Sequence, residues 1–323
     1  MAEVMDKGQE LQEQKKVEMP ITYEELRKDL QDSGRAYDFD MIDRAYELAA
    51  KAHSGQFRRS GEPYICHPLS VAQILIDLGM DSESIAAALM HDVAEDTDVT
   101  VDEIRAKFGP EVALLVDGVT KLTQIKFSNV EDRQAENLRK MLLAMSQDVR
   151  VMIIKLCDRL HNMRTGDAWP EQKRRHKAKE TMEVYAPIAH RLGISNIKEE
   201  LEDRSLQYLD PIGYGTIQGL LDEHGDDFLN DVCNTIQDHL KDNGIVNAMI
   251  KHRVKSVYGI YRKMYIQNKV FEEIYDVYAV RIILDTVAEC YTALGLIAQP
   301  VQGLHFHPQT QRLPEPAYHS HRT

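Results

Sequence analysis

The stretch 89-LMHDVAEDT-97 gathers one histidine and several carboxylates within two helical turns. On a helix, Asp92, Glu95 and Asp96 would lie at i, i+3 and i+4 and share a face, with His91 one step around from them. Such a group can hold a divalent cation and accept a proton from an attacking water. A solvated acidic face is the alternative interpretation, but the apolar run directly before His91 favours burial, and buried carboxylates require a compensating charge.

Two further segments carry side chains of the same kind. The run 155-KLCDRLHNMRT-165 places Asp158, Asn162 and Thr165 at i, i+4 and i+7 on one predicted helix face, after an apolar stretch. His67 precedes a proline at another predicted helix start, where an ordinary structural histidine is the alternative. Two histidines and two aspartates suit Mn²⁺, Fe²⁺ or a similar octahedral ion, and they leave coordination positions for water and substrate.

Helices are expected to position these residues, because apolar side chains recur at intervals of three and four through the first two thirds of the chain. The segments with this period are 21–30, 40–53, 69–80, 84–96, 101–122, 138–165, 178–193 and 226–244. The pattern of apolar residues then changes: 245–254 is predicted as a strand, 255–264 as a helix and 275–284 as a second strand. The first twenty residues are expected to be a disordered tail.

Composition limits the class of protein. The chain has 323 residues, 43% hydrophobic and 28% charged, which is typical of a globular protein of about two domains. A net charge of -13 argues against a protein that coats nucleic acid or anionic lipid. The four cysteines have no CxxC spacing and are expected to be reduced and structural. No apolar run reaches the eighteen or so residues of a membrane span, and the charged N-terminus lacks a signal-peptide core, so a cytoplasmic location is expected.

Basic residues offer candidates for binding an anionic substrate. Arg58 and Arg59 stand before Gly61, where they are either an ordinary basic turn or ligands of a polyanion. The denser run 173-KRRHKAK-179 fits a solvated helix face equally well, and only proximity to the pocket would favour a functional role. It is therefore left out of the predicted site.

The order H, then HD, then D on three helices resembles the HD metal-dependent phosphohydrolases. In particular, 56-QFRRSGEPYICHPLSVA-72, 91-HDVAEDT-97 and 158-DRLHNMRT-165 closely resemble the hydrolase domain of the RelA/SpoT family, enzymes that make and degrade the alarmones ppGpp and pppGpp. Downstream, 253-RVKSVYGIYRKM-264 and 274-IYDVYAVRIIL-284 resemble the opening of that family's synthetase domain. The resemblance runs from about residue 20 to about residue 297.

The resemblance implies roles for single residues. His67, His91, Asp92 and Asp158 would hold Mn²⁺, and Glu95 and Asp96 would act on the attacking water. Arg58, Arg59, Asn162 and Thr165 would contact the guanosine and its phosphates. Arg59 stands where many relatives carry lysine, and a planar guanidinium presents different contact geometry. The chain keeps both the HD pair and the acidic pair after it.

The resemblance also implies that the synthetase site is only begun. Arg253, Lys255 and Lys263 match residues that hold ATP phosphates, and Asp276 matches the first Mg²⁺ carboxylate, but the second catalytic glutamate and its strand do not follow. Mg²⁺ would be needed only if that site were complete. After about residue 298 the sequence is rich in Pro, Gln and His and departs from the family, as in a truncated or frameshifted reading frame; Tyr318 resembles the family's stacking tyrosine only weakly.

The expected fold is mainly α: an all-helical HD-type domain at 21–200, a helical linker at 201–225, an incomplete α/β nucleotidyltransferase-like synthetase domain at 226–298 and a non-family tail at 299–323. The expected function is a Mn²⁺-dependent (p)ppGpp 3′-pyrophosphohydrolase in the stringent response, with a small-molecule substrate and no nucleic-acid or membrane partner. The alternatives are a (p)ppGpp synthetase and a catalytically inactive nucleotide-binding fragment. Oligomeric state is not predicted.

Overall fold

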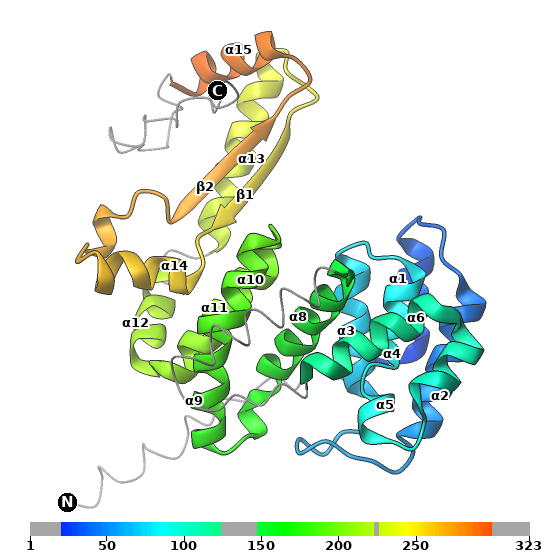
Figure 1. The fold of residues 1–323 in the computed structure, drawn as a ribbon. Coiled ribbons are helices and arrows are strands. Elements are labelled where there is room, and N and C mark those ends of the chain that lie inside the picture. The colour runs from blue at the N-terminus through cyan, green and yellow to red at the C-terminus, as the bar shows by residue number, and fades with distance from the viewer. Residues whose placement is uncertain (1–20, 124–146, 223–225, 299–323) are drawn as a thin grey trace, which may run out of the picture. The chain divides into compact units, whose positions relative to one another are not determined.

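The computed structural model describes residues 21–123, 147–222 and 226–298, and these form two compact units (Figure 1). Unit 1 comprises Met1–Arg174 and Glu183–Leu192, and unit 2 comprises Arg175–Met182 and Gly193–Thr323. The expected tails at 1–20 and 299–323, with Tyr318, and residues 138–146 of one expected helix lie outside the described residues. Each unit is described by itself.

Unit 1 is helical throughout its described part, apart from a single isolated bridge between Phe57 and Pro63. Its helices are α1 (Tyr23–Asp32), α2 (Phe39–Ala52), α3 (Cys66–Asp77), α4 (Ser82–Leu89), α5 (Val93–Asp96), α6 (Val101–Thr123), α8 (Val149–Arg164), the short η1 (Gly166–Ala168), the first part of α9 (Glu171–Glu180) and α10 (Ala186–Arg191).

Side-chain caps fix where several of these helices begin. Thr22 and Glu25 form a capping box at the start of α1, and the carboxylates of Asp81 and Asp148 accept main-chain N–H groups at the starts of α4 and α8. Helix α4, which is buried at every residue except Glu83, packs against α2, α3 and α6 and so contributes to the core of unit 1. The helices that carry the candidate residues are therefore held by packing on several sides.

Three predicted helices are interrupted in their described parts. The segment 84–96 was expected to be one helix, but α4 ends at Leu89 and α5 begins at Val93, so His91 and Asp92 lie in a turn. Gly109, with a φ of 90°, kinks α6 just before a proline, which lacks the N–H that a continuous helix would need. The segment 138–165 was expected as one helix, but among its described residues Gln147 is helical, Asp148 is extended, and α8 begins at Val149.

Unit 2 combines helices with one small sheet. Its elements after α9 and η2 (Thr181–Tyr185) are α11 (Ser195–Leu209), α12 (Pro211–Asp222), α13 (Asp226–Asp242), β1 (Met249–Val254), α14 (Val257–Tyr261), η3 (Arg262–Ile266), η4 (Phe271–Glu273), β2 (Tyr278–Ile283) and α15 (Val287–Ala298). The strands β1 and β2 pair antiparallel, with Met249 opposite Ile283 and Val254 opposite Tyr278. Both predicted strands are thus confirmed, and each is shorter than expected.

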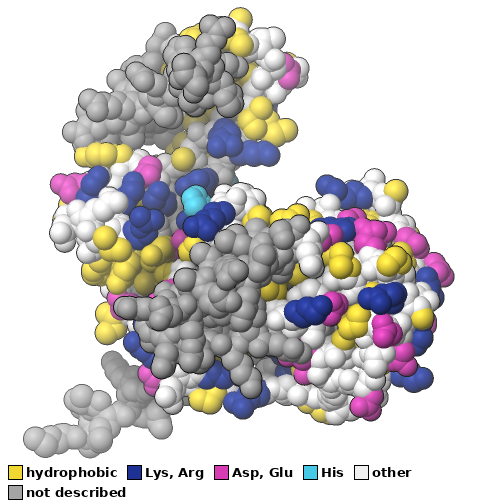
Figure 2. All heavy atoms as spheres, viewed as in Figure 1, with side chains coloured by type: hydrophobic (Ala, Val, Ile, Leu, Met, Phe, Trp, Pro, Cys, Tyr) yellow, Lys and Arg dark blue, Asp and Glu magenta, His cyan; other side chains and the backbone are white. Residues whose placement is uncertain are grey.

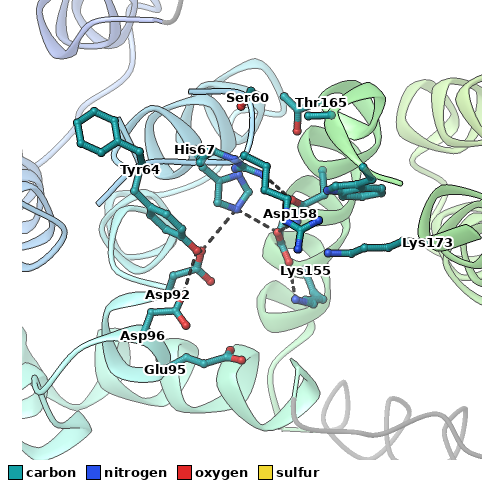
Figure 3. Close-up of a pocket in the computed structure, with 16 residues that line it drawn as sticks. Ser60, Tyr64, His67, Asp92, Glu95, Asp96, Lys155, Asp158, Thr165 and Lys173 are labelled. Atoms are coloured by element: carbon teal, nitrogen blue, oxygen red, sulfur yellow. Dashed lines mark hydrogen bonds and ion pairs between the residues drawn. The ribbon is translucent and has the colours of Figure 1, made fainter. Parts of the chain in front are cut away.

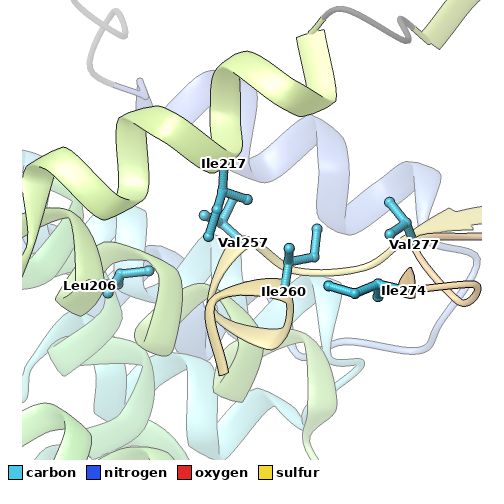
Figure 4. Close-up of a cluster of buried hydrophobic side chains, with 6 residues drawn as sticks. All are labelled: Leu206, Ile217, Val257, Ile260, Ile274 and Val277. Carbon is cyan, nitrogen blue, oxygen red and sulfur yellow. The ribbon is translucent and has the colours of Figure 1, made fainter. Parts of the chain in front are cut away.

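The core of unit 2 joins the helices before the sheet to those around it. Figure 4 shows one cluster of buried side chains, formed by Leu206, Ile217, Val257, Ile260, Ile274 and Val277. α11 and α12, which cover most of the expected linker, contribute Leu206 and Ile217 to this cluster. Asp203 on α11 accepts the main-chain N–H groups of Val257 and Tyr258 and so caps α14 from outside its own segment.

The expectation of a mainly α fold with a small α/β part is confirmed. On the face in view in Figure 2, acidic and basic side chains are interspersed over the helices of unit 1. None of the helices in the described part of the chain is long and apolar enough to cross a membrane.

Candidate metal and phosphate site

Four predicted ligands come together from three places in unit 1, and Figure 3 shows three of them, His67, Asp92 and Asp158. His67 lies in the first turn of α3, His91 and Asp92 in the turn between α4 and α5, and Asp158 in the middle of α8. His67 Nε2 lies 3.2 Å from Asp158 Oδ1 and 3.6 Å from Asp92 Oδ2. His91 Nε2 lies 3.1 Å from Asp92 Oδ1 and 3.9 Å from Asp158 Oδ1.

The break between α4 and α5 explains how His91 and Asp92 can act together. Adjacent residues on a continuous helix point about 100° apart, whereas the turn lets both side chains face His67 and Asp158. Asp92 also serves as the N-cap residue of α5, and its carbonyl accepts the N–H groups of Glu95 and Asp96. The predicted i, i+3 and i+4 spacing of the three carboxylates is therefore kept across the break.

The chemistry of these atoms fits a divalent metal ion. His91 Nδ1 lies 2.7 Å from the carbonyl oxygen of Ala88, which can only accept, so Nδ1 carries the proton and Nε2 presents a lone pair. Nε2 is buried and has no hydrogen-bond partner among the residues that the structure describes, although carboxylate oxygens lie within 4 Å of it. Nitrogen and oxygen lone pairs that face one another across a buried gap require a cation. His67, His91 and Asp158 each offer an atom within 4.8 Å of the others, and Asp92 adjoins them.

The charges around these side chains keep the aspartates ionised. Burial alone would raise the pKa of Asp158, but the ammonium of Lys155, together with His67 and His91, brings it well below its usual range. Lys155 is itself buried and donates to the Oδ2 atom of Asp158. Burial lowers the pKa of His67, so the ring is neutral at neutral pH. Neutral histidines and ionised aspartates are the forms that bind metal.

A tyrosine connects Asp96, one residue of the acidic pair, with the predicted metal ligand Asp92. The hydroxyl of Tyr64 lies 2.9 Å from Asp92 Oδ2 and 2.9 Å from Asp96 Oδ2. Burial and both carboxylates raise the pKa of Tyr64, which therefore stays protonated. Asp96 is thus held beside the ligand set, and Glu95 borders the same cavity.

The cavity above these residues has a volume of about 380 Å³ and a cationic wall. Arg58, Arg59, Asn162 and Thr165, all predicted to contact the substrate, line it together with Lys173. Arg58 Nη2 donates to Asn162 Oδ1 at 2.8 Å, and Nδ2 of Asn162 donates to Asp158. In the described part of the chain, the buried Nη1 atom of Arg58 has no hydrogen-bond partner. A cavity with metal ligands on its floor and guanidinium groups on its wall suits a ligand with several phosphates.

Sequence reasoning missed several lining residues, namely Tyr64, Lys155, Trp169 and Lys173. Lys173 opens the basic run that was left out of the predicted site, and its ammonium lies over the Trp169 ring, 5.2 Å from the centroid. Burial and the charges of Arg59 and Arg58 lower the pKa of Lys173. A functional role for the run 173–179 was expected only if it lay near the pocket, and Lys173 does line the cavity.

In unit 2, the structure gathers three of the four residues predicted for the remnant synthetase site. Lys255 Nζ lies 3.0 Å from Asp276 Oδ2, and Lys263 Nζ lies 2.6 Å from Asp276 Oδ1. Burial raises the pKa of Asp276, but the two ammonium groups bring it down to about 2. Arg253 lies on β1 opposite Ala279 and makes no ion pair among the described residues.

Two family profiles match this chain: the HD domain over residues 45–195, and the region found in RelA / SpoT proteins over residues 252–318. The second match includes residues 299–318 of the expected non-family tail. The chain belongs to the RelA/SpoT family. The recognition made from the motifs is thereby confirmed, whereas the domain limits and the roles of single residues stay predictions.

Curated relatives carry two kinds of name. A probable guanosine-3′,5′-bis(diphosphate) 3′-pyrophosphohydrolase of Synechocystis is 50% identical over 80% of this chain and 34% of its own length. A GTP pyrophosphokinase of Myxococcus xanthus is 46% identical over 82% of this chain and 36% of its own. A guanosine-3′,5′-bis(diphosphate) 3′-pyrophosphohydrolase of Haemophilus influenzae is 47% identical over 77% of this chain and 37% of its own length. The chain thus spans about a third of the length of these relatives.

Proposed function

We propose that this chain is a Mn²⁺-dependent hydrolase that removes the 3′-pyrophosphate of ppGpp and pppGpp, which yields GDP or GTP and pyrophosphate. The observation that carries the proposal is that the side chains of His67, His91, Asp92 and Asp158 lie close together at the base of a cavity lined by cationic side chains. The names of the Synechocystis and Haemophilus relatives supply the substrate. The stringent response in the cytoplasm is the proposed setting.

Each part of the cavity has a proposed task. A divalent ion bound by the four ligands would supply a Lewis acid for a phosphoryl oxygen and lower the pKa of water. Glu95 or Asp96 accepts the proton of the attacking water, and the hydroxyl of Tyr64 holds Asp96 in reach of the ligand set. Whichever of Glu95 and Asp96 does not accept the proton stays negatively charged beside the one that does.

The cationic wall binds and orients the substrate. Nη1 of Arg58 donates to no described residue, so a phosphate oxygen in the cavity that this side chain lines can accept from it without breaking the bond from Nη2 to Asn162. Arg59 and Thr165 line the same cavity, and we extend the proposed set to Lys173, whose ammonium adds a third positive charge. Charge on this wall offsets the negative charge that develops on the leaving pyrophosphate.

The test measures metal content and pyrophosphate release on the same samples. His91→Ala and Asp92→Ala should each lose bound Mn²⁺ and ppGpp hydrolysis together, because a site with few protein ligands cannot spare one. Asp98→Asn is the matched control: this exposed carboxylate lies next to the acidic pair but does not line the cavity, so both properties should be kept. Turnover by an Asp92→Ala protein that binds no metal would refute the proposal.

The second candidate is a GTP pyrophosphokinase, favoured by the name of the Myxococcus relative and by the RelA/SpoT region at 252–318. We propose that the chain as given lacks this activity. In the described part of unit 2, Asp276 is held by two lysines and the sheet has two strands. Transfer between two nucleotides requires both to be held in line, and one carboxylate is a small part of such a site.

A further inference from the structure

The two histidine ligands are held in different ways. The Nδ1 atom of His91 faces the carbonyl oxygen of Ala88, and that oxygen can only accept a hydrogen bond. The main chain of its own helix therefore fixes the ring of His91 in the form that offers Nε2 to a metal.

The Nδ1 atom of His67 instead faces a second histidine, because Nδ1 of His161 lies 2.7 Å away. A nitrogen–nitrogen contact of this length contains one proton, which either ring can carry. If His161 donates, the proton of His67 sits on Nε2 and points at Asp158. If His161 accepts, Nε2 of His67 is a lone pair directed at the same place.

We propose that His161 is a positioning residue: it accepts a hydrogen bond from Nδ1 of His67 and so presents Nε2 of His67 to the metal. This inference rests on the metal site of the proposed function. It assigns a task to the His161 side chain, which is 8% exposed. Of the four proposed ligands, His67 is the one that this side chain hydrogen-bonds in the described part of the structure.

The surroundings of His161 allow this arrangement. With Nδ1 as the acceptor, the proton of the neutral ring sits on Nε2. The ring borders a second cavity of about 260 Å³, whose wall includes Ser70, Gln73 and Arg164. That cavity is polar and large enough for water. His161 also follows Asp158 by three residues on α8, so one helix carries both a ligand and the partner of another ligand. Any shift of α8 would disturb both together.

The experiment compares His161→Leu with His161→Asn in the full chain. Leucine fills a similar volume but accepts no hydrogen bond, whereas the amide oxygen of asparagine lies close to the former place of Nδ1 and accepts one. Ser70→Ala is the control, because it alters the same second cavity while its hydroxyl bonds the carbonyl of Cys66 and not His67. Each protein is stripped of metal and titrated with Mn²⁺, and the free ion is measured by electron paramagnetic resonance.

His161→Leu should weaken Mn²⁺ binding by about 10- to 100-fold, the usual effect of removing the hydrogen-bond partner of a ligand. His161→Asn should recover most of this loss, and Ser70→Ala should bind as the wild type does. Melting temperatures of the metal-free proteins should fall alike for His161→Leu and His161→Asn, since both remove the ring. Wild-type affinity in His161→Leu, or equal weakness in both variants, would overturn the inference.

A measurement without substitution covers the case in which His161→Leu does not fold. Nitrogen-15 spectra of wild-type protein loaded with Zn²⁺, a diamagnetic substitute, should show His67 protonated at Nδ1; an unprotonated Nδ1 overturns the inference. Failure of the proposed function is separable from failure of this inference. Wild-type protein that binds Mn²⁺ but does not hydrolyse ppGpp contradicts only the function, while active wild type with unchanged affinity in His161→Leu contradicts only the task of His161.

Discussion

The buried ion pair of Asp158 and Lys155 leads us to predict a change in the free energy of unfolding that can be measured without any assay of catalysis. The two residues are 4% and 7% exposed, and their side chains form an ion pair three residues apart on α8. In Asp158→Asn the ammonium of Lys155 loses a charged partner that burial makes necessary. Breaking a buried pair in this way costs on the order of 3–5 kcal/mol of unfolding free energy, much more than the hydrogen bond alone.

The assay is urea unfolding in the presence of EDTA, so that metal binding does not contribute. The single tryptophan of the chain, Trp169, lies in unit 1 at the edge of the cavity and reports the unfolding of that unit. Lys155→Met added to Asp158→Asn should recover about 2 kcal/mol or more, because it removes the buried positive charge. Neither protein should bind Mn²⁺.

A surface pair provides the matched control. Asp117 and Lys121 form an i, i+4 pair on α6 in which the lysine is 72% exposed, so Asp117→Asn should change stability by no more than about 0.5 kcal/mol. The reasoning is refuted if Asp158→Asn costs no more than this control, or if Lys155→Met does not restore stability in the double variant.

Three further predictions concern the acidic pair, the second candidate activity and unit 2. Glu95→Gln or Asp96→Asn should keep Mn²⁺ binding but lower ppGpp turnover by a factor on the order of 10² to 10⁴, and an emptied metal site would contradict this division of tasks. With ATP, GDP and Mg²⁺ the chain should form no ppGpp above background; a clear ATP-dependent product would show otherwise. Burial raises the pKa of Asp203 to about 6, against two main-chain N–H donors that lower it. The folded unit then binds this proton more tightly than the unfolded chain, so the contribution to stability is full below about pH 4 and is lost as the pH rises through about 6. Asp203→Asn should remove this pH dependence from hydrogen exchange in α14, after correction for intrinsic rates.

Periodicity predicted most of the described helices and both strands, though not their ends, and the motifs with their family resemblance indicated the residues on the floor of the cavity. Asp158, Asn162 and Thr165 share a helix face by spacing alone, and the structure joins the first two by a hydrogen bond. The break at His91 could not be seen, because an apolar run followed by two polar residues has the same period whether or not the helix continues. Only tertiary contacts with α3 and α8 decide where that helix ends.

Several residues of the cavity could not be predicted, because the local sequence pattern does not show which partner they contact. Lys155 stands in an apolar run, where a lysine usually extends its charge to solvent, and nothing local shows that it turns toward Asp158. Tyr64 precedes Asp96 by more than thirty residues, and their contact depends on how the segment before α3 lies relative to α5. Lys173 belongs to a run whose composition fits a solvated face, so its place beside Trp169 required the fold.

The hydrogen bonds from Arg58 to Asn162 and from Asn162 to Asp158 connect a phosphate-binding group with a metal-binding carboxylate. An ion that draws Asp158 toward itself also sets the amide of Asn162, and with it the direction of the guanidinium. A metal ion bound at Asp158 would therefore reduce the conformational entropy that the Arg58 side chain loses when it binds phosphate. Thermodynamic reciprocity then requires that the nucleotide tighten the ion by the same factor as the ion tightens the nucleotide. Under the proposed function, metal loading of this chain in a cell poor in Mn²⁺ would therefore be highest when ppGpp is abundant.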